Sequence, residues 1–170
     1  MKTIDLLLVS IIFLFTSCNN NQSDIQEKEE LINTNLNTFI DSYLNKKDIS
    51  QLKEIVDENY IRKMNGVIVA SNIQELKATI NVFLSGFPDY KFISENSYIK
   101  DNNAFVYWTF TGTNRADFAE QPATGKKVTV NGYSHFYFNK KGKIYKEEGF
   151  YNELDLLQQL GYTLKPPVVE

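Results

Sequence analysis

Apolar residues recur at steps of three and four in the first half of the chain, the spacing of one face of an α-helix. The clearest stripe predicts a helix that contains Ile32, Leu36, Phe39, Ile40, Tyr43 and Leu44. A shorter helix is expected around residues 52–56. A third helix is predicted over residues 73–84, because Ser71 and Gln74 form a capping box before it and Gly86 follows its last apolar position.

The period of the pattern changes to two after residue 88, and aromatic and β-branched residues become frequent. This pattern predicts strands over residues 90–100, 104–113, 127–138 and 143–151, and a strand-like segment at 67–69. Turn residues at 101–103 and 140–142 separate neighbouring strands. A last short helix is expected at 153–160. Helices followed by hairpin-linked strands predict an α+β fold, with the helices packed on one face of an antiparallel sheet.

The N-terminus has the pattern of a targeting sequence. Lys2 precedes a short apolar run at residues 6–15, and small residues then lead to Cys18. Such a run is too short to cross a bilayer as a helix, and the order of features is typical of a signal peptide. It looks like a bacterial lipoprotein signal, in which Cys18 is lipidated. The alternative is a buried N-terminal helix that contains an ordinary core cysteine.

The lipoprotein interpretation divides the chain into three parts. Residues 1–17 are the expected signal peptide, residues 18–28 the lipidated Cys and a polar tether, and residues 29–170 a single folded domain. A chain processed in this way would be anchored by lipid to the membrane of a bacterial cell envelope. The expected localisation is therefore the envelope, with Cys18 as the point of contact with the membrane.

The composition excludes several classes of function. The 170 residues include one Cys and one His, which excludes an internal disulfide framework, a multi-Cys zinc site and a His-rich metal centre. The formal net charge of −3 argues against a nucleic-acid partner, because phosphate binding needs clustered Lys and Arg. No nucleotide-binding glycine motif, nucleophile elbow or EF-hand loop is found in the sequence. We therefore expect no metal site built from Cys or His.

Five stretches of the sequence, in order, are similar to one family: ELKATINVFLSGFPDYKF, VYWTFTGTN, QPATGKKVTVNG, GKI and LLQQLG. Between Asp48 and Gly161 the chain resembles the SnoaL-like polyketide (ester) cyclases of the nuclear transport factor 2-like superfamily. The resemblance implies a cone-shaped α+β barrel, a curved antiparallel sheet packed on N-terminal helices around a pocket for a small hydrophobic molecule. It also implies cofactor-free aldol cyclisation or isomerisation of a carbonyl compound by acid–base chemistry.

The resemblance places the family's acid–base Asp nine residues before Gly161, where this chain has Asn152. An amide does not exchange protons near neutral pH, so Asn152 is a candidate for substrate binding and not for proton transfer. Glu148 shares a strand face with Phe150 and Asn152 and is therefore a candidate catalytic residue. The alternative interpretation of Glu148 is a solvated carboxylate within a run of charged residues near a sheet edge.

His135 is the second catalytic candidate, because imidazole is the side chain that titrates nearest pH 7. It shares a strand face with Tyr133 and Tyr137, and the alternative is a structural role among these aromatic residues. Trp108 and Tyr133 are expected to contact a ligand. The sequence leaves open which face of the strands lines the pocket.

Three functions remain compatible with these patterns. The first is a cyclase or isomerase, which requires His135 or Glu148 to meet Asn152 in a closed cavity. The second is a non-catalytic module that kept the pocket for a small hydrophobic molecule and lost the catalytic Asp. The third is an envelope interaction protein that uses the outer face of its sheet for a partner or a homodimer.

Overall fold

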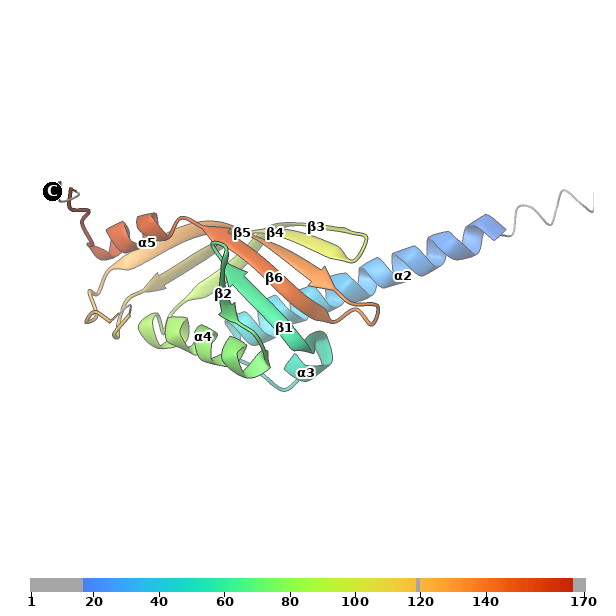
Figure 1. Ribbon diagram of the computed structural model, residues 1–170, viewed down its shortest axis with the longest axis horizontal. Coiled ribbons are helices and arrows are strands. Elements are labelled where there is room, and N and C mark those ends of the chain that lie inside the picture. The colour runs from blue at the N-terminus through green and yellow to red at the C-terminus, as the bar shows by residue number, and fades with distance from the viewer. Residues whose placement is uncertain (1–16, 119, 167–170) are drawn as a thin grey trace, which may run out of the picture.

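The computed structural model describes residues 17–118 and 120–166, which form a curved sheet with helices gathered on one side (Figure 1). The helices are α2 (Ser17–Thr38), continued by the π-helical segment η1 (Phe39–Asn45), then α3 (Leu52–Ile55), α4 (Ile73–Gly86) and α5 (Glu153–Leu160). Residues 18–28, predicted as a polar tether, are helical and belong to the part of α2 that projects beyond the sheet. The predicted signal sequence lies outside the described residues, apart from its last residue.

Six strands form the sheet: β1 (Val56–Met64), β2 (Val67–Ala70), β3 (Lys91–Lys100), β4 (Asn103–Thr113), β5 (Lys127–Phe138) and β6 (Ile144–Tyr151). Their order is β2-β1-β6-β5-β4-β3, so the sheet is open and has β2 and β3 at its edges. The predicted α+β class is confirmed, with a curved sheet that does not close into a barrel. One detail differs: β1 and β6 pair in parallel, so the sheet is mixed and not wholly antiparallel.

The strand β1 was not predicted from the sequence. Residue 56, which the pattern assigned to a helix, begins β1, and most of the strand that follows is polar and partly exposed. Its pairing with β6 is interrupted between Val56 and Ile61, so the strand never shows a clean alternation of buried and exposed positions. Long-range pairing with β6 therefore decides the structure of this segment, and local propensity does not; Arg62 and its partner Glu147, for example, are 85 positions apart.

The hydrophobic core lies between the helices and the face of the sheet that they cover, which we call the inner face. All six residues of the predicted helical stripe are buried on α2 and η1. Phe39 illustrates the packing: its ring centroid lies 5.4 Å from that of Tyr43 and 5.8 Å from that of Phe136 on β5. The inner face of β4 contributes Val106 and Trp108 to the same cluster. Burial of these aromatic rings is the main force that holds α2 and η1 on the sheet.

The capping of α4 is displaced by one residue from the prediction. The Asn72 side chain, and not that of Ser71, accepts a hydrogen bond from the backbone of Glu75 (2.9 Å). The Glu75 carboxylate in return accepts from the backbone N–H of Ser71 (2.7 Å). This reciprocal arrangement satisfies donors at the helix start and fixes where α4 begins. Among the described residues, no helix has both the length and the apolar character that a membrane span requires.

Candidate functional site

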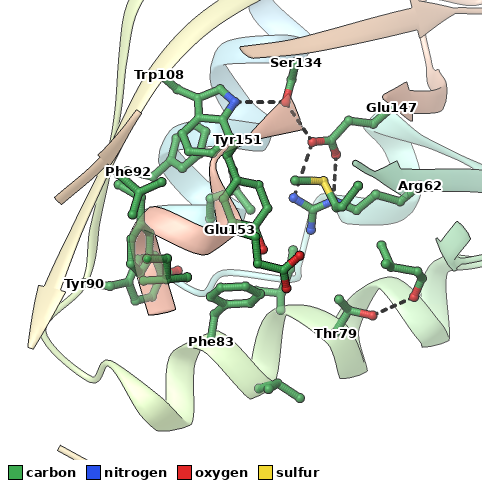
Figure 2. A pocket seen from close by; sticks show the side chains of 18 of the residues that line it. Arg62, Thr79, Phe83, Tyr90, Phe92, Trp108, Ser134, Glu147, Tyr151 and Glu153 are labelled. Carbon is green, nitrogen blue, oxygen red and sulfur yellow. Dashed lines mark hydrogen bonds and ion pairs between the residues drawn. The ribbon is translucent and has the colours of Figure 1, made fainter. Parts of the chain in front are cut away.

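A cavity of about 340 Å³ lies between the inner face of the sheet, α4 and α5 (Figure 2). Its wall is mostly apolar, with Phe83 from α4, Phe92 and Trp108 from β3 and β4, and Leu157 from α5. The polar residues that line it are Arg62, Thr79, Tyr90, Ser134, Glu147, Tyr151 and Glu153. An apolar cavity with a few polar groups is the usual form of a small-molecule site.

A bulge in β6 brings a carboxylate to this cavity. Tyr137 of β5 pairs with Lys146, whereas the next residue of β5, Phe138, pairs with Ile144, so Tyr145 is an extra residue in β6. An extra residue reverses the alternation of side chains beyond it. Ile144 and Glu147 therefore both point to the inner face, although they are three residues apart, and both are buried.

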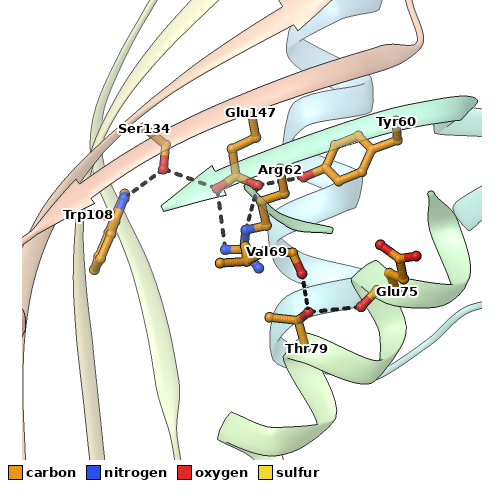
Figure 3. A network of polar contacts seen from close by, with 8 residues as sticks. All are labelled: Tyr60, Arg62, Val69, Glu75, Thr79, Trp108, Ser134 and Glu147. Carbon is orange, nitrogen blue, oxygen red and sulfur yellow. Dashed lines mark hydrogen bonds and ion pairs between the residues drawn. The ribbon is translucent and has the colours of Figure 1, made fainter. Parts of the chain in front are cut away.

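Glu147 is the centre of a buried polar network (Figure 3). Its carboxylate accepts hydrogen bonds from the Tyr60 hydroxyl (2.7 Å), the Ser134 hydroxyl (3.2 Å) and Nη2 of Arg62 (3.3 Å). Ser134 also accepts a bond from Nε1 of Trp108 (3.0 Å), which ties the indole ring of the cavity wall to the network. The network joins β1, β4, β5 and β6 and so fixes the positions of the groups that line the cavity.

Arg62 and Glu147 form a buried ion pair. The Arg62 Nε lies 3.2 Å from Oε2 of Glu147, and the side chains are 13% and 3% exposed. Burial lowers the pKa of Arg62, but the Glu147 carboxylate, with the hydroxyls of Tyr60 and Tyr43, outweighs this effect and the pKa is raised. Burial, followed by the negative charge of Glu147, raises the pKa of Tyr60, which stays a hydrogen-bond donor. The pair carries one positive and one negative charge and is neutral as a unit.

Two buried tyrosine hydroxyls have no hydrogen-bond partner among the described residues. The hydroxyls of Tyr43 and Tyr90 are buried and unpaired, and Nε of Arg62 is not aligned for a hydrogen bond despite its closeness to Glu147. Burial raises the pKa of Tyr90 to about 12 and that of Tyr43 still further, so both are protonated donors at neutral pH. Buried donors without acceptors are costly, and they are expected where a ligand or water completes the site.

The candidates His135 and Glu148 do not reach this cavity. Glu148 accepts a hydrogen bond from Tyr137 (2.7 Å) and pairs with Lys146 (2.9 Å), on the opposite, outer face of the sheet. His135 lies on the same outer face, where its ring stacks between Phe105 and Tyr137 with centroids at 4.2 and 3.8 Å. The structure thus corrects the prediction that one of the two meets Asn152 in a closed cavity. Glu148 lies on the outer face because the bulge at Tyr145 reverses the alternation of side chains and turns Glu147 to the inner face.

The three predicted ligand contacts have different positions. Trp108 lines the cavity. Tyr133 lies on the outer face, stacked against Phe105 at 6.0 Å and 37% exposed, so the structure separates it from the cavity. Asn152 is also absent from the cavity lining and caps α5, where its side chain accepts from the backbone N–H of Asp155 (3.0 Å).

Three residues that line the cavity, Arg62, Tyr90 and Glu147, were not predicted from the sequence. Arg62 lies on the unrecognised strand β1, and Glu147 was treated as one member of a charged run. Between Ile144 and Gly149 the predicted strand has three consecutive charged residues, Lys146, Glu147 and Glu148, so the sequence does not single out Glu147. No pattern in the sequence pointed to Arg62 as the partner of Glu147, because the two residues are 85 positions apart.

Comparison with known proteins assigns the fold to a family. The sequence model of the SnoaL-like polyketide cyclases matches residues 34–160, which is most of the chain. This chain belongs to the SnoaL-like polyketide cyclase family. No curated protein sequence matches it. Its open α+β sheet is that of the nuclear transport factor 2-like superfamily, to which SnoaL-like cyclases belong.

Three solved structures illustrate the similarity. A protein named as a SnoaL-like polyketide cyclase from Jannaschia sp. CCS1 is 19% identical, with a TM-score of 0.70 over 82% of this chain and 95% of that chain. A SnoaL-like polyketide cyclase from Agrobacterium tumefaciens is 21% identical, with a TM-score of 0.63 over 76% and 98%. A phenazine biosynthesis-related protein from Pseudomonas aeruginosa is 16% identical, with a TM-score of 0.67 over 87% and 96%. At these identities the structures establish the fold alone.

Within this SnoaL-like fold, Glu153 is a further carboxylate at the cavity. It follows Asn152, the position on which the family's acid–base Asp falls, and it lines the cavity from the first turn of α5 (Figure 2). Tyr151, one residue before Asn152, also lines the cavity; burial and the nearby charge of Glu153 raise its pKa to about 12. The two neighbours of Asn152, and not Asn152 itself, therefore face the cavity of this SnoaL-like protein.

Proposed function

We propose that this protein binds a small, mostly apolar carbonyl compound in the cavity between α4, α5 and the inner face of the sheet. The observation that supports this proposal is an apolar wall interrupted by buried hydrogen-bond donors that have no partner among residues 17–118 and 120–166. A carbonyl oxygen is an acceptor without a donor of its own, so it complements such donors. Membership of the SnoaL-like family supports the same class of ligand.

Mass spectrometry tests this proposal directly. The intact protein is purified under native conditions, its mass is measured, and any released molecule is identified after denaturation. The variant Leu157→Trp places a bulky ring at the cavity wall, and Leu154→Trp changes an exposed residue of the same helix that does not line the cavity. We expect the ligand to be lost from Leu157→Trp and kept by Leu154→Trp. Equal retention by both variants would show that the ligand binds elsewhere.

Removal of a proton next to the carbonyl group of the ligand is a second candidate function. It is favoured by Glu153, a carboxylate that lines the cavity beside the family's acid–base position. A positioned base typically contributes a factor of about 10² to 10⁴ to such a step. Deuterium exchange at the carbon next to the carbonyl of 1-tetralone can be followed by NMR. Exchange that slows at least tenfold in Glu153→Gln, but not in Glu148→Gln, would support catalysis; equal rates in all three proteins favour the non-catalytic binding module.

We also propose that Cys18 is lipidated and anchors the protein to the cell envelope. The proposal is supported by the apolar run before Cys18, the only cysteine in the chain, and by the projection of α2 away from the domain (Figure 1). Expression of the full chain in bacteria with radiolabelled palmitate would test it. We expect label and membrane association for the wild type and neither for Cys18→Ser. Membrane association that persists without Cys18 would contradict a lipid anchor at this residue.

A homodimer through the outer face of the sheet is a further proposal. Exposed rings gather on this face: Tyr98, Tyr107, Tyr133, Tyr145 and Phe150. Glu148 is paired there with Lys63 and Lys146, so its negative charge does not oppose a second copy of the face. Sedimentation velocity should show a dimer that dissociates in Tyr107→Glu and persists in the control Leu154→Glu. A monomer at high concentration would contradict the proposal.

A further inference from the structure

The cavity contains more hydrogen-bond donors than the protein uses. Arg62 directs Nη2 toward Glu147, and its hydrogen bonds within the described residues involve no other nitrogen. The Tyr90 hydroxyl has no acceptor in the described part of the chain. The same is true of the Tyr43 hydroxyl, which lies close enough for its pKa to respond to both Arg62 and Tyr90. Leaving such groups unpaired costs stability, so their presence indicates that something other than the protein pairs with them.

The two donors that line the cavity lie at separate places. Figure 2 shows Arg62 and Tyr90 on opposite sides of the cavity, with the ring of Tyr151 between them. Arg62 is supplied by β1, and Tyr90 by the segment that leads from α4 into β3. The wall between them is formed by rings, among them Phe83. A ligand that satisfies both donors must therefore have acceptor atoms at two positions, joined by an apolar body.

The charges around the cavity restrict the ligand further. Arg62 is the only Lys or Arg among the lining residues, and its charge is already balanced by Glu147. Glu153 adds a second negative charge at the cavity. A carboxylate ligand would therefore enter a site that carries no unmatched positive charge, and it would lose its hydration without a counter-ion.

We infer that Arg62 and Tyr90 are specificity-determining donors, and that they select an uncharged apolar molecule with a carbonyl oxygen at each end. This inference rests on the proposed function and adds to it the number of acceptors, the charge of the ligand and the residues that recognise it. Tyr43 lies behind the lining and supports the same polar region. Neither Arg62 nor Tyr90 was expected from the family resemblance.

The experiment uses three probes that share one cage: adamantane, adamantane-2,6-dione and adamantane-1-carboxylate. Trp108 is the only tryptophan of the chain and lines the cavity, so its fluorescence reports binding. At pH 7.5 we expect the dione to bind at least tenfold more tightly than the carboxylate. Tighter binding of the carboxylate would overturn the assignment of an uncharged ligand. If no probe binds, the proposed function and this inference both fail.

The variant Tyr90→Phe tests the hydrogen-bond donor alone, because it removes the hydroxyl and keeps the ring in the cavity wall. We expect it to weaken binding of the dione about threefold to tenfold, the range of one neutral hydrogen bond, and to change the affinity for adamantane less than twofold. Tyr98→Phe is the control, since Tyr98 is 61% exposed on the outer face and does not line the cavity. An equal effect of Tyr90→Phe on both probes would overturn the donor role while leaving cavity binding intact.

The paired variant Arg62→Gln with Glu147→Gln tests the other end of the cavity, since it removes both charges together and leaves no unpaired ion. We expect the paired variant to weaken binding of the dione more than binding of adamantane, as Tyr90→Phe should. If the affinity for the dione changes no more than the affinity for adamantane, Arg62 is not a donor that recognises the ligand. Circular dichroism checks that the paired variant is folded; if it is not, the Tyr90→Phe result decides between acceptance and rejection.

Discussion

Glu147 and Glu148 are neighbours on β6, yet they occupy two different electrostatic environments. Glu147 lies on the inner face, 3% exposed, and is held by Arg62, Tyr60 and Ser134. Glu148 lies on the outer face, partly exposed, where the hydrogen bond from Tyr137 and then Lys146 lower its pKa to about 2. The comparison shows that the face of the sheet decides whether a carboxylate is part of the cavity or part of the surface.

The same contrast extends to the other residues of each face. On the inner face, Arg62, Ser134 and Glu147 have largely buried side chains that line the cavity, and Arg62 and Ser134 are both joined to Glu147. On the outer face, aromatic rings and charged groups stack and pair next to solvent, as His135 does between Phe105 and Tyr137. Substitutions on the inner face should therefore cost much more stability than the equivalent substitutions on the outer face.

Glu147→Ala is expected to have the largest effect. It leaves the guanidinium of Arg62 buried without a counter-ion, which typically costs about 3–5 kcal/mol of unfolding free energy. Urea unfolding followed by circular dichroism measures this loss. Glu148→Ala is the control from the outer face, and we expect it to lose about 1 kcal/mol or less. Similar losses for the two variants would remove the distinction between the faces.

Tyr60→Phe should have the next largest effect. It removes the 2.7 Å hydrogen bond to Glu147, a bond to a charged group in a buried position, and the expected loss is about 1.5–3 kcal/mol. Tyr137→Phe removes a bond of the same length to Glu148 on the outer face. Because water can replace that bond, we expect a smaller loss in the same unfolding measurement. A larger loss for Tyr137→Phe would contradict the comparison.

Gly132→Ala tests how closely the inner face is packed. A Cβ atom at Gly132 would lie 2.1 Å from Cζ2 of Trp108, so the indole ring must move. Overpacking of this kind costs about 1–3 kcal/mol, and it should also shift the fluorescence spectrum of Trp108. Asn131→Ala, one residue away on the outer face, should leave both the stability and the spectrum almost unchanged. An unshifted spectrum in Gly132→Ala would mean that the indole is not fixed by this contact.

The smallest effect concerns the pH dependence of stability that Glu148 contributes. Its pKa falls from an ordinary 4.5 to about 2 in the folded state, so folding favours the ionised form. The stabilisation is complete above pH 4.5 and disappears as the pH falls from 4.5 toward 2. The difference in unfolding free energy between the wild type and Glu148→Gln, at most about 1 kcal/mol at pH 7, should shrink over this interval. A difference that stays constant would contradict the lowered pKa.

Much of the fold could be predicted from the sequence because its signals are local. The period of three to four residues identified α2 with η1 and α4, and the period of two identified β3 to β6. The alternation along β5 also grouped Tyr133, His135 and Tyr137 on one face, where the structure has them. These features follow from side-chain geometry along a single helix or strand, which the sequence contains in full.

The cavity network could not be predicted in this way. The strand β1 has a polar, irregular pattern and forms only because β6 pairs with it. The bulge at Tyr145 exchanges the roles of Glu147 and Glu148, and nothing in the order of residues 144–148 indicates it. Arg62, which completes the site, meets Glu147 across 85 positions of sequence. Pairing and register between distant strands determined each of these features.

The sequence by itself determined the α+β order of elements, the family resemblance, the absence of a His-rich or multi-Cys metal site, and Asn152 in place of the family's Asp. Only the tertiary structure decided which carboxylate faces the cavity and which donors are left without partners. The physical reason is that hydrophobic periodicity is set locally, whereas burial, charge pairing and hydrogen-bond satisfaction depend on residues brought together by the curved sheet. That assembly places Glu147 and Arg62 at the cavity, and it leaves Glu148 and His135 on the outer face.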